Sequence, residues 1–181
     1  MSISVIDDFL DPEHFLVLKE TMMSALFPWF YTPYIIYESE IDKAYKFQFT
    51  HVFYSDHYRM GESDEKNRAL PGYQSINSEY FNLVVPLIAK LNSRAMIRIK
   101  ATLLTRTSHN TKFDYHVDYD CDSTTSIFYI NTNDGYTEFK DGKKRIQSVE
   151  NRLVTFPVGM EHTGTTCTDE KIRVVLNFNY F

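Results

Sequence analysis

The sequence predicts a mainly β (α+β) protein, in which a double-sheet jelly roll follows helices that pack on one of its sheets. Two segments with apolar residues at helical spacing lie before residue 96, and short strand-like segments separated by turns follow. Of the 181 residues, 43% are hydrophobic. This length and composition fit one domain, with helical support over about 1–95 and a β core over about 96–181.

Both helices are expected in the first half of the chain. The expected elements there are a strand at 4–6, a helix at about 11–26, a strand at 45–54, a loop at 60–72 and a helix at about 78–91. Asp11 can cap the first helix, and Pro12 suits its first turn. Pro86 should kink or shorten the second helix, because proline donates no backbone hydrogen bond.

The second half of the chain changes to short strands and turns. Strands are expected near 96–106, 113–118, 124–131, 136–140, 144–149, 152–156 and 171–181. The pair Asp141-Gly142 is typical of a hairpin turn between two of them. So many short antiparallel strands favour two facing sheets.

Charge and cysteine content limit the possible classes of function. The net charge of −5 gives no general attraction for nucleic acid or for an anionic membrane. Cys121 and Cys167 are isolated and lack metal-type spacing, which suits a reducing compartment. The sequence shows no signal-peptide pattern and no apolar run of membrane-spanning length, so we expect a soluble, cytoplasmic protein.

The segment with the most chemical information contains His116 and Asp118. In a strand, side chains alternate between the two faces, so these two side chains should point the same way. A second histidine, His162, lies in a turn-rich stretch further along the chain. Two imidazoles and one carboxylate are the ligand set of a non-haem Fe(II) site. The sequence therefore predicts His116, Asp118 and His162 as metal ligands and catalytic residues.

The last strand should have one apolar and one polar face. Ile172, Val174 and Leu176 alternate with Arg173 and Asn177, and the same alternation continues to the end of the chain. The apolar face is expected under the helices. A guanidinium on the opposite, inward face is costly to bury without a partner, and its planar fork suits a carboxylate. Either this face lines a polar cavity that Arg173 enters, or the strand is a solvent-exposed edge.

Together these motifs resemble the Fe(II)/2-oxoglutarate-dependent oxygenases, and most closely their prolyl-hydroxylase-like branch. That family combines a double-stranded β-helix with a His-x-Asp…His triad and a basic residue about ten positions later. Three further stretches of this chain are similar to segments of the family: 126–131 (SIFYIN), 135–139 (GYTEF) and 151–157 (NRLVTFP). The resemblance covers roughly residues 96–181. Asp134, Thr107 and Asn110 depart from the family pattern.

The resemblance implies a hydroxylase that uses Fe(II), 2-oxoglutarate and O2 and releases succinate and CO2. Arg173 would pair with the distal carboxylate of 2-oxoglutarate, with Tyr129 beside it, and Thr125 would supply a hydrogen bond that the departures remove. The substrate would be a peptide or protein side chain or a small molecule, with no nucleic acid or membrane as partner.

Other interpretations remain open on sequence alone. A cupin-like metal enzyme without 2-oxoglutarate, or a non-catalytic jelly-roll binding module, would share the fold. The acidic residues around Asp118 could form a weak Ca²⁺ loop, although this leaves His162 unexplained. His51 and His57 could mark a second site, but partly exposed positions near the pocket are favoured. The alternating cations of one strand are expected in solvent: Arg98, Lys100 and Arg106.

Overall fold

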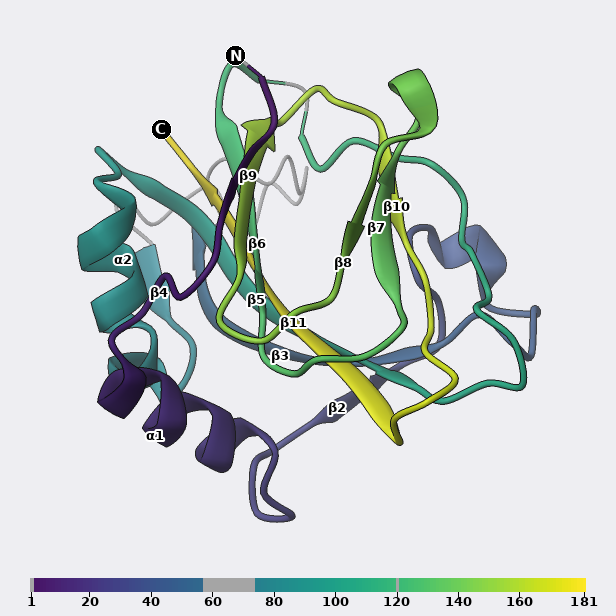
Figure 1. Ribbon diagram of the computed structural model, residues 1–181, viewed down its shortest axis with the longest axis horizontal. Helices are drawn as coiled ribbons and strands as arrows, with labels where there is room; N and C mark the ends of the chain where they lie inside the picture. The colour runs from purple at the N-terminus through teal and green to yellow at the C-terminus, as the bar shows by residue number, and fades with distance from the viewer. Residues whose placement is uncertain (1, 57–73, 120) are drawn as a thin grey trace, which may run out of the picture.

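The computed structural model describes residues 2–56, 74–119 and 121–181, and it contains two antiparallel sheets that face each other (Figure 1). Within these residues the large sheet has eight strands, in the order β1-β9-β6-β11-β5-β3-β2, with β4 paired to β3. The small sheet has three strands, in the order β10-β7-β8. This arrangement confirms the predicted jelly roll. The loop expected at 60–72 lies outside the described residues.

Eight strands form the large sheet: β1 Ser4–Ile6, β2 Phe30–Thr32, β3 Gln48–Asp56, β4 Gln74–Ile76, β5 Met96–Thr105, β6 Thr124–Tyr129, β9 Leu153–Pro157 and β11 Ile172–Tyr180. The small sheet has β7 Tyr136–Phe139, β8 Arg145–Gln147 and β10 His162–Gly164. The helices are α1 Pro12–Met22 and α2 Val85–Leu91, with 3₁₀ turns at Glu38–Glu40, Phe81–Leu83 and Asp141–Lys143. The last turn joins β7 to β8 at the predicted Asp141-Gly142, where Gly142 has a φ of +64°.

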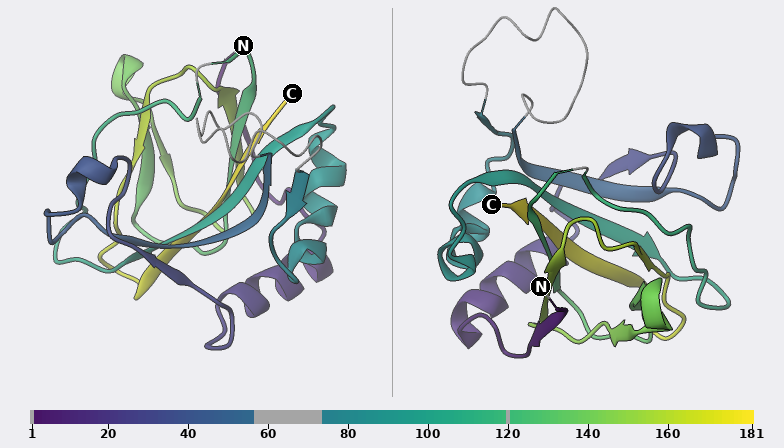
Figure 2. Two further views of the ribbon diagram at one scale, coloured as in Figure 1. Left: turned by 180° about the vertical axis from the view of Figure 1, so that it is seen from behind. Right: turned by 90° about the horizontal axis from the view of Figure 1, so that it is seen from above.

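Helices α1 and α2 cover the outer face of the large sheet (Figures 1 and 2). Leu18 and Met22 of α1 belong to one apolar cluster with Val174 and Leu176 of β11. All four side chains are almost completely buried, and Ile172 packs at the margin of the cluster. The predicted direction of the two faces of the last strand is therefore confirmed.

A second, smaller cluster fills part of the space between the two sheets. It contains Tyr129, Val154, Phe156 and Val175 of the large sheet and Phe139 of the small one. The Phe139 and Phe156 rings meet edge to face with centroids 4.9 Å apart. Val175 places this cluster on the inner face of β11. The polar side chains of the same face, Arg173 and Asn177, therefore lie on either side of this apolar packing.

The N-terminal half departs from the sequence prediction in both helices. Helix α1 ends at Met22 rather than near residue 26, and Leu26 is 88% exposed. The second helix begins only at Val85, because Pro86 occupies its first turn and a separate 3₁₀ turn precedes it. Residues 1–95 also contribute four strands, β1 to β4, to the large sheet. The description of this half as helical support was therefore incomplete.

The two segments that carry the predicted ligands also differ from expectation. Residues 113–118 form no continuous strand and contain a single isolated bridge, which pairs His116 with His162. The turn-rich stretch around His162 instead contains a short strand, β10. The cause is pairing between segments far apart in the chain, which local patterns do not report.

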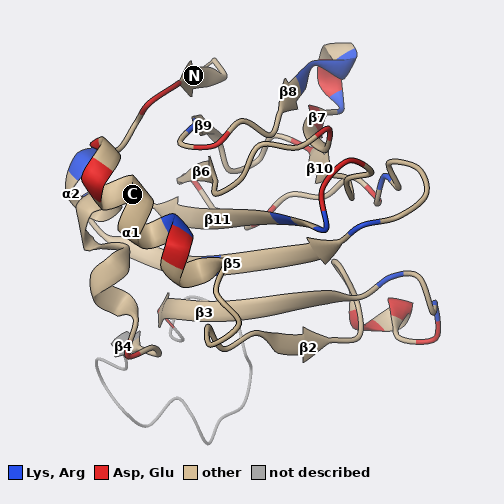
Figure 3. Cartoon of the chain, turned by 60° about the horizontal axis from the view of Figure 1, so that its bottom comes forward, with Lys and Arg blue, Asp and Glu red and all other residues tan. Residues whose placement is uncertain are grey.

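The charged residues are interspersed on loops and helices, while the long strands carry few of them (Figure 3).

Helix α1 has only 11 residues, and none of the helices in the described ranges reaches the length and apolarity needed to cross a bilayer.

Candidate metal centre

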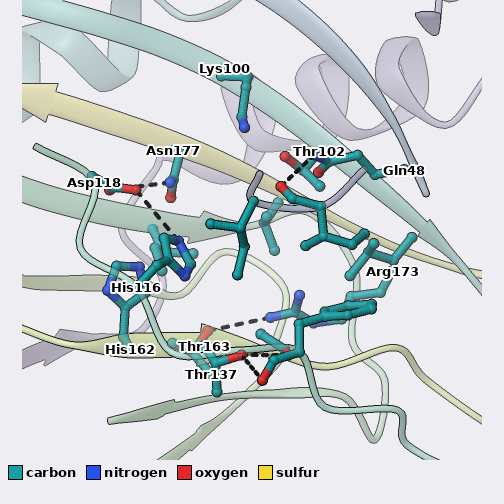
Figure 4. Close-up of a pocket in the computed structure, with 17 residues that line it drawn as sticks. Gln48, Lys100, Thr102, His116, Asp118, Thr137, His162, Thr163, Arg173 and Asn177 are labelled. Atoms are coloured by element: carbon teal, nitrogen blue, oxygen red, sulfur yellow. Dashed lines mark hydrogen bonds and ion pairs between the residues drawn. The ribbon is translucent and has the colours of Figure 1, made fainter. Parts of the chain in front are cut away.

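The structure brings His116, Asp118 and His162 together at one end of a cavity between the sheets (Figure 4). One possible ligand atom from each side chain lies within 4.8 Å of the other two. The two imidazole rings have centroids 4.6 Å apart, and His116 Nε2 lies 3.8 Å from Asp118 Oδ1. Paired backbone hydrogen bonds of 3.0 Å between His116 and His162 hold the two segments in register.

Both histidines can present a ring nitrogen to a metal ion. His162 Nδ1 donates to the carbonyl oxygen of Met160 at 3.0 Å, which leaves Nε2 free as an electron-pair donor. The ring of Phe156 packs edge-on against His162 at 4.8 Å and fixes its plane. Burial, together with the nearby His162, lowers the pKa of His116 to about 4. At neutral pH His116 is therefore uncharged and able to bind a metal.

Asp118 is held by donors from three strands. Its Oδ2 accepts hydrogen bonds from Asn179 Nδ2 at 2.9 Å and from Thr125 Oγ1 at 3.1 Å, and Asn177 Nδ2 lies 3.5 Å away. Arg98 Nη2 is 3.7 Å from Oδ1. Burial acts to raise the pKa of Asp118, but His162, Arg98 and the surrounding donors outweigh it and lower the pKa to about 2. The carboxylate is therefore ionised.

This donor set fits a divalent transition metal. Two neutral imidazoles and one carboxylate carry a single negative charge and occupy one side of the cavity, so a bound ion would keep open positions toward the cavity. Within the described residues, His116, Asp118 and His162 form the one group of potential metal ligands whose ligand atoms lie this close together. The Ca²⁺ interpretation is disfavoured, because imidazole nitrogen is a poor ligand for calcium.

Arg173 lies at the other end of the same cavity, whose volume is about 100 Å³. The residue is 3% exposed, and its guanidinium donates through Nε to Ser148 Oγ at 2.8 Å and lies 3.4 Å from Thr137 Oγ1. It also stands over the ring of Tyr129 at 5.6 Å. No carboxylate of the described residues forms an ion pair with Arg173, so the charge is open to an anionic ligand.

Gly135 makes room for this arginine. A Cβ atom at position 135 would lie 2.6 Å from Arg173 Cδ and 2.7 Å from Asn133 Oδ1. Such distances are too short for ordinary contacts, so any larger residue would displace the Arg173 side chain. The glycine that opens the 135–139 stretch is therefore explained by close approach to the cavity arginine.

The other two predicted cosubstrate residues lie outside the wall of the cavity. The hydroxyl of Tyr129 donates to Thr137 Oγ1 at 2.8 Å, and Thr137 itself lines the cavity. Thr125 donates to Asp118 and accepts from Asn179 at 3.0 Å. Tyr129 thus positions a wall residue next to Arg173, and Thr125 holds a metal ligand; neither faces the space where a cosubstrate would lie.

Sequence reasoning missed several parts of the cavity. The expectation that the cations of β5 face solvent was wrong for Arg98, which approaches Asp118, and for Lys100, which lines the cavity. Ile35, Ile36 and Gln48 of the N-terminal half also line it. Gln48 Nε2 donates to the carbonyl of Ile35 at 2.8 Å and holds that segment against β3.

A second site at His51 is not supported. His51 is buried, and its Nδ1 donates to the carbonyl oxygen of Pro28 at 2.8 Å while Nε2 lies 2.7 Å from Ser78 Oγ. Both ring nitrogens are therefore engaged in joining β3 to neighbouring loops, and the expected partial exposure was wrong. His57 lies outside the described residues.

The fold and the donor set together define a jelly-roll protein with a two-histidine, one-carboxylate cluster in its cavity. No protein-family model matches the sequence, and no curated protein matches it significantly. Solved structures do match. An oxidoreductase of the 2OG-Fe(II) oxygenase family from Burkholderia pseudomallei has a TM-score of 0.69 at 9% identity, over 98% of this chain and 84% of that chain.

Two prolyl hydroxylases are also similar in structure. The viral collagen prolyl hydroxylase of Paramecium bursaria Chlorella virus 1, a 2OG complex, gives a TM-score of 0.58 at 12% identity, over 99% of this chain and 95% of that one. The Trichoplax adhaerens enzyme, in complex with a hypoxia inducible factor peptide fragment, gives 0.59 at 12% identity, over 99% and 83%. This chain therefore has the fold of the Fe(II)/2-oxoglutarate oxygenases, and its reaction has to be argued from its own site.

Asn179 offers a test of how Asp118 is held. Asn179→Ala is expected to lower the affinity for Mn(II) by about 10- to 100-fold, because it removes the shortest hydrogen bond to the metal-binding carboxylate. Asn177→Ala is the matched control, since its amide lies 3.5 Å from the same oxygen and its loss should matter less. Calorimetric titration of Mn(II) measures both. Equal affinities of Asn179→Ala and the parent protein would refute a positioning role.

Proposed function

We propose that this protein is a non-haem Fe(II)- and 2-oxoglutarate-dependent oxygenase that hydroxylates an unactivated C–H bond. One observation carries the proposal: a buried arginine, for which the described residues offer no acidic partner, and a two-histidine, one-carboxylate cluster line the same small cavity. A dicarboxylate whose one end binds the metal and whose other end meets Arg173 satisfies both features. The fold shared with known 2OG-Fe(II) oxygenases supports this assignment.

Each residue of the site has a defined task in this proposal. His116, Asp118 and His162 hold Fe(II), and Arg173 binds the distal carboxylate of 2-oxoglutarate through its planar fork. Ser148 and Thr137 orient the guanidinium through their hydroxyl groups. Fe(II), when bound with 2-oxoglutarate and O2, supplies the oxidation of the C–H bond with release of succinate and CO2. The apolar walls exclude water and so protect the reactive centre.

The substrate belongs to one of two broad classes, a peptide or protein side chain or a small molecule. A structural neighbour from Trichoplax adhaerens binds a peptide fragment, which supports the first class. Nucleic acid is disfavoured by the net charge of −5. A cupin-like enzyme that does not use 2-oxoglutarate is the second candidate, but it leaves the unpaired Arg173 without a ligand.

The decisive experiment measures turnover of 2-oxoglutarate by the purified protein. The protein is incubated with Fe(II), ascorbate and 2-oxoglutarate, and succinate is quantified by mass spectrometry with and without a panel of peptides and metabolites. Slow succinate formation is expected without substrate, and a marked increase with the correct one. If Fe(II)-loaded protein neither binds nor consumes 2-oxoglutarate, the proposal is wrong and a 2-oxoglutarate-independent metal enzyme becomes the better interpretation.

A further inference from the structure

Lys100 is a cation inside the cavity for which the reaction described above has no role. It lies in the middle of β5, between Asn177 of β11 and Val52 of β3. Its strand neighbours Ile99 and Ala101 point to the core under the helices, so Lys100 points to the opposite, inner face. Figure 4 shows its amine directed into the cavity.

The Lys100 amine has no hydrogen bond and no ion pair to any described residue, unlike the other cations around the cavity. Arg98 approaches Asp118, Lys46 is bound by both Glu40 and Asp114, and Arg173 donates to Ser148. Burial, with Arg98 nearby, lowers the pKa of Lys100 to about 8. Lys100 as a residue is half-buried, and a cation turned into a cavity without a partner is unfavourable, so its presence here points to a ligand that completes it.

Charge balance also points to an anion. The charged side chains that line the cavity are Lys100, Arg173 and Asp118, and they leave one positive charge. A divalent metal and the 2-oxoglutarate dianion cancel each other. One positive charge therefore remains in the loaded cavity.

The position of Lys100 separates it from the anion site at Arg173. In the pairing of β5 with β11, Lys100 stands opposite Asn177, whereas Arg173 stands opposite Leu104. Four residues of strand separate the two cations, or about 13 Å along the strand. Arg173 is drawn further toward the far end by Ser148. Lys100 instead lies at the end where Asn177 approaches Asp118.

We propose that Lys100 binds a carboxylate at the metal end of the cavity, distinct from the carboxylate held by Arg173. Two molecules could supply it: 2-oxoglutarate, through the carboxylate next to its keto group, or an acidic primary substrate. The charge left over in the loaded cavity favours the substrate, which would then be a carboxylic acid, a free amino acid or an acidic side chain. The inference rests on the proposed function, which supplies the metal and the dicarboxylate that occupy the rest of the cavity.

The test compares the parent protein with Lys100→Met, which keeps the length of the side chain and removes the charge. Lys171→Met is the matched control, because Lys171 is an exposed lysine on the neighbouring strand segment and lies outside the cavity lining. Calorimetry measures 2-oxoglutarate binding to each Mn(II)-loaded protein. A second titration adds acetate, the simplest carboxylate, to each protein saturated with 2-oxoglutarate. Lys100→Gln replaces the methionine variant should that variant fail to fold.

The expected result is a loss of acetate affinity of at least about 10-fold in Lys100→Met, with 2-oxoglutarate affinity within about twofold of the parent. A comparable loss for 2-oxoglutarate instead would assign the carboxylate to the cosubstrate and also support an anion site at Lys100. The proposal is overturned if neither ligand depends on Lys100, including the case in which acetate does not bind. If the protein binds no 2-oxoglutarate but binds acetate in a way that depends on Lys100, the proposed function is refuted and the anion site at Lys100 is supported.

Discussion

Asp118→Ala is expected to abolish divalent metal binding and 2-oxoglutarate turnover together. The substitution removes the anionic member of the ligand set and leaves two neutral imidazoles, so affinity for Mn(II) or Fe(II) should fall by more than about 100-fold. The loss should not reflect unfolding alone, because the side chain lies at the cavity end rather than in either apolar cluster. Calorimetry gives the metal affinity, succinate formation gives the turnover, and thermal melting reports the fold.

Asp122→Ala provides the control that separates this site from an acidic metal loop. Asp122 lies four residues further along the chain and is exposed. It stands outside the converging group of ligands, so its replacement should leave metal affinity unchanged. A parallel loss of metal binding in Asp118→Ala and Asp122→Ala would contradict the two-histidine, one-carboxylate centre and favour oxygen ligands alone.

The fold class, the two faces of β11 and the common side of His116 and Asp118 could be predicted because each depends on a short-range pattern. In β11, alternation alone determines that Val174 and Leu176 share one face and Arg173 the other. The long apolar side chains had to face the helices, and the guanidinium therefore had to face the opposite sheet. Likewise, the spacing of His116 and Asp118 places both side chains on one side even though their segment is not a continuous strand.

Other features could not be predicted because they depend on which segments pair in space. The alternation of Arg98 and Lys100 along β5 shows that they share a face, and it does not reveal whether that face meets solvent or a second sheet. The structure answers this, because β5 lies between β3 and β11 in the middle of the large sheet. Cations on one face of a central strand indicate a polar cavity on that face. To apply this rule, one would have had to know that β3 pairs with β5 and makes β5 a central strand.

The contribution of the N-terminal half to the cavity was hidden for the same reason. Ile35 and Ile36 lie on an irregular segment whose backbone amides donate to the buried carboxylate of Glu40 at 3.2 and 3.0 Å. Lys46 joins Glu40 to Asp114, two residues before the first metal ligand. This ion-pair bridge ties the wall of the cavity to the segment that carries His116. No local motif in the sequence indicates such a bridge, since Lys46 and Asp114 are separated by 68 residues.

These interactions give the cavity two functionally different ends. At the metal end, the ligands are held by Asn179, Thr125 and the backbone pairing of His116 with His162. At the other end, Arg173 is held by hydroxyl groups and by the space at Gly135, and no carboxylate in the described part of the chain pairs with it. Loss of the arginine should therefore affect the binding of an anion and leave the metal unaffected.

Arg173→Ala is accordingly expected to raise the apparent KM for 2-oxoglutarate by about 100-fold or more, because a desolvated charge pair is lost. Affinity for Mn(II) should stay within about twofold of the parent, since Arg173 contacts no metal ligand. Arg173→Lys should recover part of the effect, because the charge survives while the planar, two-pronged geometry does not. Succinate formation as a function of 2-oxoglutarate concentration gives KM, and calorimetry gives the metal affinity.

Lys171 is the residue that could replace Arg173 in this role, since it has the same strand parity and the same charge. The structure places it at the exposed start of the strand and outside the cavity lining, so Lys171→Ala should leave KM unchanged. The reverse pattern, with a normal KM in Arg173→Ala and a raised KM in Lys171→Ala, would mean that the dicarboxylate enters from the exposed end of β11. A normal KM in both variants would remove the reason to expect a dicarboxylate beside Arg173, because its buried charge would then serve only Ser148 and Thr137.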